Sequence, residues 1–309
     1  MSVTVEENNK YRDFCIRIAR EGGCFDFQPD QLVWHYTDGP GLLGILQSST
    51  LYATQVSGLN DAKETRHASD LFAKALKQLA IDRADETEVV TFLNSIVQFS
   101  KDNENSHSIS KFFVTCFSGE EDDLTQWDRY GRQNGYAIAF YARGLQREPT
   151  STLFRVVYDN EKHETAAREI AEATVRFYFE GLNEERSKDP ELWARDFLTA
   201  WDEWIYRLAP LVKAAKWKAE NEYRIVHELK VAEFPIVRFA AKATMIARYI
   251  ALDTPSWVKR RTPLLPIAKI FVGPGNNYAL TKVSIALLLD QMGYAPLPIE
   301  ATTCSLTRP

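Results

Sequence analysis

Hydrophobic positions along the chain follow two spacings, and these spacings predict where its helices and strands lie. Apolar residues at helical spacing predict helices over 9–21, 60–80, 86–100 and 278–292, with a brief one near 42–46 and a turn or two near 124–130. Short runs of β-branched and aromatic residues predict strands over 32–36, 51–54, 111–117, 136–141, 153–158, 222–227, 236–239, 248–252, 267–272 and 296–299. Helices and strands are therefore mixed throughout the chain.

The stretch from 162 to 214 differs from the rest because its pattern is wholly helical. It carries aromatic residues at helical spacing, among them Phe177, Trp193, Phe197 and Trp201. Such a stripe is typical of helix packing and not of a surface that stacks bases. We predict one α+β domain over 1–309, with an N-terminal helical extension at 1–28 and an inserted helical subdomain at 160–214.

Charge and cysteine content narrow the class of protein. A net charge of −5 argues against a protein that coats nucleic acid, and the short basic clusters at 213–218 and 259–261 are typical of solvated faces. The four cysteines lie far apart without metal-ligand spacing, which favours a reduced cytosol and no metal. A polar N-terminus and the lack of a long apolar run predict a cytoplasmic protein without membrane contact.

The common signatures of nucleotide-binding loops, metalloproteases and serine hydrolases do not occur in the chain, so individual polar residues carry the chemistry. His35 lies within a strand, where its ring points to the face opposite Trp34 and Tyr36. A strand histidine alone is more often a hydrogen-bonded core or rim residue than a catalytic one. Together with Tyr52 of the following strand, however, it could line one cleft.

A second group of polar residues lies in the segment 220–226. If this segment is extended, Glu220, Glu222 and Arg224 share one face, which indicates either an exposed ion-pair ladder or a functional site. Asp61 and Glu64 form a capping box at a helix start, and Asn60 before them either turns the chain or holds a ribose. The sequence leaves both choices open.

An ordered set of short motifs resembles the bacterial family of unknown function DUF2971. The resemblance extends from near residue 31 to near 308 and is weakest over 160–210. The motifs are WHYT at 34–37, LYAT at 51–54, LNDAKE at 59–64, CFS at 116–118, QWDRYG at 126–131, GYAIAF at 135–140, KWKAENEYRI at 216–225 and IFVGPG at 270–275.

This pattern in turn resembles the ADP-ribosyltransferase superfamily, which implies a mixed, mostly antiparallel sheet and NAD as substrate. The resemblance implies that Glu222 stabilises the positive charge of the breaking nicotinamide–ribose bond and that Glu220 orients or deprotonates the acceptor. His35 would hold the adenosine-side ribose, and Tyr52 would stack on nicotinamide. The implied NAD-binding set is completed by Tyr36, Thr37, Asn60, Trp127, Tyr130 and Arg224. Of these, Trp127 and Tyr130 lie on a loop that could fold over the cleft and shield the reaction from water.

The resemblance leaves the biological task open. The acceptor would be an unknown protein or nucleic acid, and the protein could act as a toxin or an antiphage effector, or simply hydrolyse NAD. The alternative is a non-catalytic module that senses a nucleotide or binds a partner through the same cleft. Two carboxylates favour catalysis, since a site that only binds phosphates would more naturally present cations.

Overall fold

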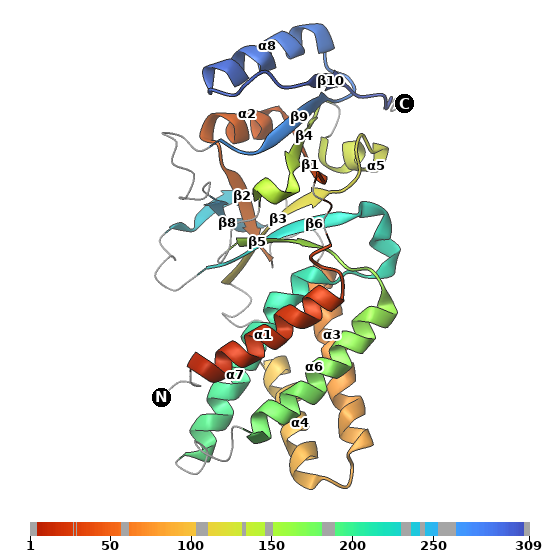
Figure 1. Cartoon of the computed structure of the whole chain (residues 1–309), viewed down its shortest axis with the longest axis vertical. Coiled ribbons are helices and arrows are strands. Elements are labelled where there is room, and N and C mark those ends of the chain that lie inside the picture. The colour runs from red at the N-terminus through yellow and green to blue at the C-terminus, as the bar shows by residue number, and fades with distance from the viewer. Residues whose placement is uncertain are drawn as a thin grey trace.

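A large, mostly antiparallel sheet and a bundle of long helices are stacked along the longest axis of the molecule (Figure 1). The computed structural model describes residues 5–26, 28, 30–56, 62–102, 111–131, 134–145, 151–180, 189–229, 236–241, 245–252 and 264–305. The mixture of helices and strands expected from the sequence is confirmed, as is the mostly antiparallel pairing.

The strands of the sheet follow the order β10-β9-β4-β1-β3-β2-β8-β7, with β6 paired to β3 and β5 paired to β6. Only β10 and β9 pair in parallel among these strands. The bounds are β1 Leu32–Thr37, β2 Leu51–Gln55, β3 Phe112–Ser118, β4 Tyr136–Tyr141, β5 Ser151–Arg155, β6 Glu222–Glu228, β7 Arg238–Ala241, β8 Ile246–Leu252, β9 Ile267–Val272 and β10 Ile299–Ala301.

The sheet branches at β3. One edge of β3 pairs with β6 along its whole length, Phe112–Ser118 against Glu222–Glu228. The opposite edge pairs with β2 at Phe113 and Val114 and with β1 at Ser118. Because β1 and β2 diverge from this one edge, a gap opens between them beside the middle of β3.

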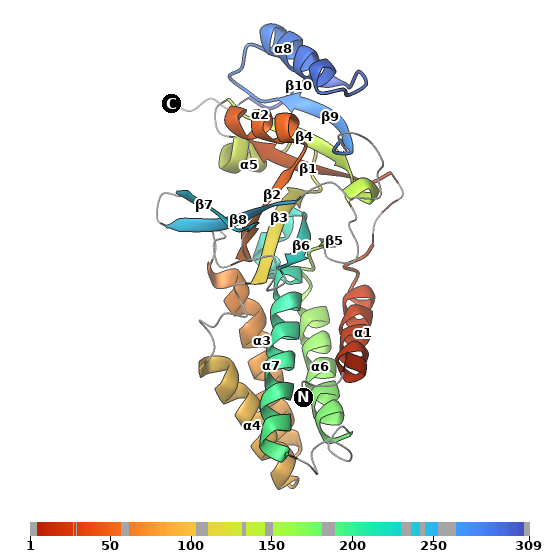
Figure 2. The same cartoon turned by 90° about the vertical axis from the view of Figure 1, so that its left-hand side faces the viewer.

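The long helices lie below the sheet, where α3, α6 and α7 run side by side (Figure 2). The bundle is closed by aromatic packing, such as the stacked rings of Phe92 and Tyr178 at 3.7 Å. None of the helices that the structure describes is long and apolar enough to cross a membrane. The bounds of the bundle helices are α1 Val5–Glu21, α3 Ala62–Asp82, α4 Thr87–Asp102, α6 Asn160–Glu180 and α7 Pro190–Leu208.

The helices predicted over 160–214 therefore do not stand apart. They pack against α3 and α4, which precede the strand β3 in the chain, and against the N-terminal α1. Two separate stretches of sequence thus build the helical half. Apolar side chains such as Phe92, Val175 and Phe197 belong to one core that extends from α4 to α7.

Short helices lie at and above the opposite end of the sheet (Figure 1). The sequence predicted a turn at 39–41 followed by a helix, but α2 already begins at Gly39. Asp38 caps α2 by accepting a hydrogen bond from the Gly41 amide at 2.9 Å, and Pro40 fits the first turn. The bounds here are α2 Gly39–Ser48, α5 Leu124–Gln126, the π-helical turn η3 Trp127–Gly131 and α8 Tyr278–Gln291. Three 3-10 turns lie elsewhere along the chain, η4 Ala142–Leu145, η7 Ala215–Glu220 and, against α3 and α7, η6 Ala209–Leu211.

Candidate functional site

The gap between β1 and β2 is closed by two side chains. His35 Nδ1 lies 3.0 Å from the carbonyl oxygen of Cys116, and the Thr115 hydroxyl donates to the carbonyl of Tyr52 at 3.0 Å. Since a carbonyl can only accept, Nδ1 of His35 carries the proton. Burial lowers the pKa of His35, against the opposing effect of the Cys116 carbonyl, so the ring is neutral near pH 7 and Nε2 is an acceptor.

A small pocket of about 110 Å³ lies where the ends of β1, β3 and β6 meet. Its walls come from these three strands and from the helical turns α5 and η3. Ten residues line it: Trp34, His35, Tyr36, Cys116, Phe117, Ser118, Gln126, Tyr130, Glu220 and Glu222. The pocket therefore brings together an imidazole, two phenols and two carboxylates.

Glu222 is the first residue of β6, and its carboxylate is held on two sides. Arg224 binds it through two hydrogen bonds, from Nε to Oε1 at 2.9 Å and from Nη2 to Oε2 at 2.7 Å. Lys213 adds a third donor at 3.2 Å from Oε2. All three side chains are at least nine-tenths buried, so this is a buried ion cluster and not a surface pair.

Glu220 extends the same cluster toward the surface. Lys213 Nζ lies 2.5 Å from Oε2 of Glu220, and Arg129 from η3 lies 2.5 Å from Oε1. Lys213 thus bridges the two carboxylates, and each carboxylate also has its own guanidinium. Three cations face two anions, so the ion cluster carries one net positive charge.

The charge state of Glu222 follows from these contacts. Burial acts to raise its pKa, but Arg224, Lys213 and a hydrogen bond from the Cys116 side chain outweigh burial and lower the pKa from 4.5 to about 2. Glu222 is therefore a carboxylate at any physiological pH. Burial and the nearby carboxylate of Glu220 raise the pKa of Tyr130 to about 12, so Tyr130 remains a hydroxyl donor.

The lowered pKa of Glu222 predicts how stability responds to acid. A carboxyl whose pKa is lowered by folding stabilises the native state above its ordinary pKa, and this contribution is lost as pH falls through the folded value. We expect the difference in unfolding free energy between wild type and Glu222→Gln to shrink between about pH 5 and about pH 2. Urea titrations across this range measure it, and a difference independent of pH would contradict the assignment.

Five of the residues predicted from the sequence come together in this pocket. They come from β1, from η3, from the end of η7 and from the start of β6, and they are His35, Tyr36, Tyr130, Glu220 and Glu222. The hydroxyl of Tyr36 is already engaged: it donates to the Glu120 carbonyl at 2.9 Å and accepts from the Asp123 amide at 3.0 Å. Tyr36 therefore contributes its ring to the wall while its hydroxyl fixes the loop before α5.

Other predicted residues lie outside the lining. Tyr52 is half-exposed and its ring packs on Tyr249 of β8 at 4.9 Å. Trp127 is fully buried, and its indole nitrogen donates to Asp122 at 2.8 Å. It supports the loop from below, which corrects the expectation of a movable cover, because its ring is enclosed in a small core with Trp34 and Phe271.

The remaining residues of the predicted NAD-binding set, and the predicted capping box, do not line the pocket in the described part of the chain. Arg224 reaches the pocket only through Glu222, and Thr37 ends β1 without lining the pocket. Asn60 and the proposed cap Asp61 lie outside the described residues, as does the side chain of Glu64.

The expectation of one extended face for Glu220, Glu222 and Arg224 is wrong at its first member. Glu220 ends the 3-10 turn η7, and Asn221 adopts a left-handed backbone with φ 38°, so β6 begins only at Glu222. The turn rotates the Glu220 side chain out of the strand and places Lys213 between the two carboxylates, as the shared contacts show. The exposed ion-pair ladder is thereby excluded.

Sequence reasoning missed several contributors to the site. Lys213 was assigned to a solvated basic face, yet it is only 5% exposed because Glu220 and Glu222 compensate its charge. Ser118, by contrast, belongs to the CFS motif singled out in the sequence, and it lines the pocket, where its hydroxyl donates to the Glu220 carbonyl at 3.1 Å and accepts from the Glu120 amide. Arg129 and Gln126 belong to helical turns whose ends no periodic pattern specifies.

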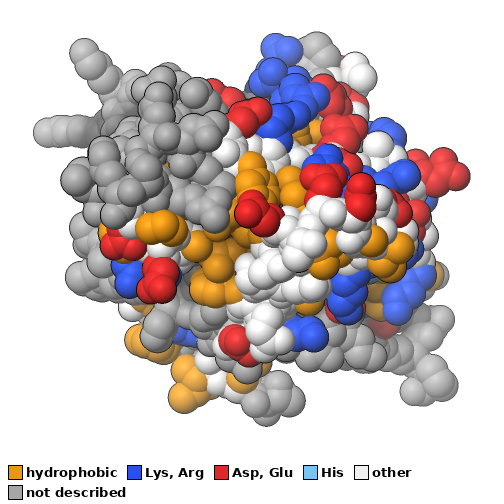
Figure 3. Space-filling model, turned by 90° about the horizontal axis from the view of Figure 1, so that it is seen from below, with side chains coloured by type: hydrophobic (Ala, Val, Ile, Leu, Met, Phe, Trp, Pro, Cys, Tyr) orange, Lys and Arg blue, Asp and Glu red, His pale blue; other side chains and the backbone are white. Residues whose placement is uncertain are grey.

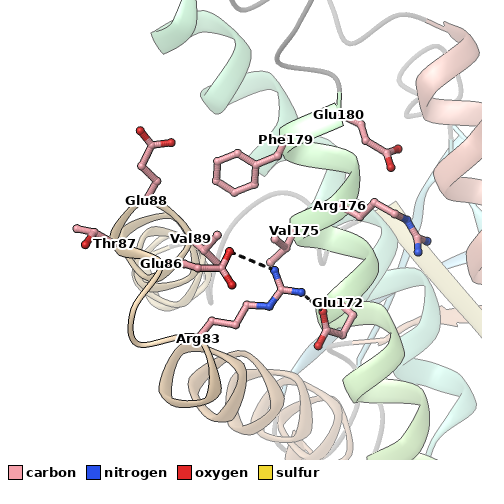
Figure 4. A pocket seen from close by; sticks show the side chains of 10 residues that line it. All are labelled: Arg83, Glu86, Thr87, Glu88, Val89, Glu172, Val175, Arg176, Phe179 and Glu180. Carbon is pink, nitrogen blue, oxygen red and sulfur yellow. Dashed lines mark hydrogen bonds and ion pairs between the residues drawn. The ribbon is translucent and has the colours of Figure 1, made fainter.

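A second and larger hollow, of about 800 Å³, lies on the helical half between the α3–α4 turn and α6 (Figure 4). Arg83 crosses it to Glu172 at 2.9 Å and approaches Glu86 at 3.6 Å, while the Phe179 ring forms part of the wall. Acidic and basic side chains are interspersed on the face seen from the bundle end (Figure 3). The larger hollow holds none of the predicted residues, and we place the candidate site in the smaller pocket on chemical grounds.

Comparison with known proteins gives a match to one family model over part of the chain and no activity. Residues 126–225 match the family model described as "Protein of unknown function (DUF2971)". The matched segment contains Tyr130, Glu220 and Glu222, and so covers the η3 and η7–β6 walls of the pocket. No curated protein and no solved structure is significantly similar to the chain.

Proposed function

We propose that the pocket at the ends of β1, β3 and β6 binds the nicotinamide end of NAD and that Glu222 promotes transfer of ADP-ribose to an acceptor. One observation carries this proposal: an ionised carboxylate is held by Arg224 and Lys213 in the lining of a small pocket. His35 supports it, since a neutral imidazole with a free acceptor nitrogen can receive a hydrogen bond from a ribose hydroxyl.

The reaction suits these groups. The bond between ribose C1′ and the nicotinamide nitrogen breaks, nicotinamide leaves with the bonding pair, and positive charge develops on the ribose. A fixed carboxylate beside C1′ stabilises that charge more than it stabilises bound NAD, which lowers the barrier. The acceptor then bonds to C1′ and loses a proton, for which Glu220, the other carboxylate in the lining, would serve as the base.

The volume of the pocket limits what can enter. At about 110 Å³ it is well below the roughly 300 Å³ at which pockets for whole drug-sized ligands begin. This volume would enclose at most the nicotinamide ring, and the ribose and the rest of NAD would lie at the mouth of the pocket or outside it. Such an NAD-consuming activity would suit a toxin or an antiphage effector.

A non-catalytic nucleotide-binding module is the second candidate, and one observation favours it. Both oxygens of Glu222 already accept hydrogen bonds from Arg224, and Oε2 accepts a further one from Lys213. A carboxylate so engaged stabilises a cationic transition state less than a free one. Release of nicotinamide distinguishes the two candidates, because a binding module produces none.

Tyr130 and Tyr52 offer a matched test of where NAD binds. Their exposed fractions are 42% and 50%, but only Tyr130 lines the pocket. We expect Tyr130→Ala to weaken NAD binding by about 10-fold, the scale of one lost aromatic contact, and Tyr52→Ala to leave it unchanged. Calorimetric titration of NAD into wild type and both variants measures the effect.

The same titration can contradict the proposal. If wild type does not bind NAD, or if Tyr52→Ala weakens binding while Tyr130→Ala does not, NAD does not occupy this pocket. Thermal unfolding of the two variants controls for general damage. Both side chains are partly exposed, so we expect each melting temperature to stay close to that of the wild type.

A further inference from the structure

Trp217 of η7 is surrounded by positively charged groups. The guanidinium of Arg129 lies 5.2 Å from the centre of its ring, and the ammonium groups of Lys216 and Lys213 lie 5.4 Å and 5.6 Å from it. The ring itself is only partly buried. A cation over an aromatic face is attracted by it, and a partly exposed aromatic ring beside cations can stack a base while the cations bind its phosphates.

These residues border the candidate pocket. Arg129 and Lys213 both bind Glu220, whose carboxylate belongs to the lining. Tyr130 follows Arg129 directly and is 42% exposed, so a second aromatic ring lies at the same edge. Whatever rests on Trp217 is therefore close to the groups assigned to the transfer reaction.

Two of the cations on η7 are available to a partner. Lys216 and Lys218 are exposed, and neither forms an ion pair with another residue in the described ranges. Lys213, by contrast, is occupied by the two carboxylates, and Arg129 by one. We name Arg129, Lys216, Trp217 and Lys218 the Trp217 platform.

The charge around the platform is not uniform. Glu120 is hydrogen bonded to Asn221, which directly follows η7, so an acidic group stands beside the basic ones. A partner held by charge alone would gain little here, given the net charge of −5 of the whole chain. A partner that combines stacking on an aromatic ring with two or three phosphate contacts fits the platform better, and this combination is typical of unpaired nucleic acid.

We propose that the Trp217 platform binds single-stranded nucleic acid and presents one of its bases as the acceptor. A base stacks on the indole of Trp217, and Lys216 and Lys218 bind the flanking phosphates. A duplex hides its base faces inside the helix and therefore offers nothing for Trp217 to stack on. The binding step stands by itself, and only the role of the base as acceptor rests on the proposed function.

Fluorescence anisotropy with a labelled single-stranded oligothymidylate of about 15 nucleotides tests binding, since one basic groove covers roughly 4–16 nucleotides. We expect Trp217→Ala to weaken binding about 10-fold or more, the usual scale for one lost stacking contact. The Lys216→Ala/Lys218→Ala variant should weaken binding and flatten its salt dependence by about 1.4 in the log–log slope, at 0.7 for each lost phosphate contact.

A control variant distinguishes the contribution of the Trp217 platform from the general effect of removing two positive charges. Lys77→Ala/Lys101→Ala removes the same two charges from exposed positions of α3 and α4 on the helical half, and should bind as wild type does. The proposal is overturned if wild type does not bind the oligonucleotide at low salt, or if the two double variants weaken binding equally. It also fails if a duplex of the same length binds as tightly as the single strand.

Failure of this inference and failure of the proposed function have different signatures. Oligonucleotide binding without NAD binding would remove the transfer reaction and leave the platform in place. NAD binding and nicotinamide release without oligonucleotide binding would keep the reaction and exclude nucleic acid as the acceptor. Mass spectrometry of the oligonucleotide after incubation with NAD tests transfer directly, through the added mass of one ADP-ribose.

Discussion

Glu222→Gln is expected to lower nicotinamide release from NAD by about 100-fold or more while NAD binding persists. Gln keeps the size of the side chain and its ability to accept from Arg224, but it has no charge with which to stabilise a positive ribose. An interaction that acts only in the transition state affects turnover and not binding. Nicotinamide release, measured beside calorimetric titration of NAD, separates the two quantities.

Glu228→Gln is the matched control on the same strand. Glu228 ends β6 and forms an ion pair with Arg207 of α7, outside the pocket. The Glu228→Gln variant therefore loses a paired carboxylate, as Glu222→Gln does, and should release nicotinamide as fast as the wild type. If Glu222→Gln folds and stays fully active, the carboxylate that serves the reaction is another one, and Glu220 is the next to test.

Arg224→Met is expected to destabilise the protein by about 3–5 kcal/mol, the cost of leaving a buried charge without its partner. Arg224 is 2% exposed and supplies two of the three hydrogen bonds from Arg and Lys side chains that hold the Glu222 carboxylate. Its Nη1 also donates to the Pro210 carbonyl at 3.1 Å, which ties β6 to η6. Urea unfolding, followed by circular dichroism, gives the free energy.

Two further variants test whether the buried charge causes the loss of stability in Arg224→Met. Arg129→Met removes a guanidinium of the same ion cluster whose side chain is 41% exposed, and should cost no more than about 1 kcal/mol. Glu222→Met/Arg224→Met replaces both charges by apolar groups, and should be less destabilised than the sum of its single variants. Equal losses for Arg224→Met and Arg129→Met would mean that burial does not control this cluster.

Local patterns in the sequence were sufficient for most of the elements. The strands β4 and β9 begin and end where alternation and turn residues predicted them, because each lies within one uninterrupted run. The sequence also predicted that His35 points to the face of β1 opposite Trp34 and Tyr36. In the structure His35 packs on Phe117 of one core, while Trp34 and Tyr36 belong to another. A period of two fixes such faces without knowledge of the neighbouring strands.

The candidate site was less predictable because it depends on long-range placement. No local signal shows that β1 and β2 share one edge of β3, and it is this branching that separates Tyr52 from the pocket. The left-handed Asn221 moves Glu220 out of the strand, and Asn is among the few residues that adopt this conformation readily. An Asn between two Glu residues was the one available hint of a turn there.

The pairing of β3 with β6 has a consequence for synthesis of the protein. The two strands are antiparallel neighbours, yet α6 and α7 and more than a hundred residues of chain separate Ser118 from its partner Glu222. A ribosome adds roughly 5–20 residues each second, so His35 and Ser118 exist for several seconds before Glu220 and Glu222 can join them. A nascent chain stopped before β6 carries no assembled site, and an NAD-consuming centre would become complete only after the helical half has left the ribosome.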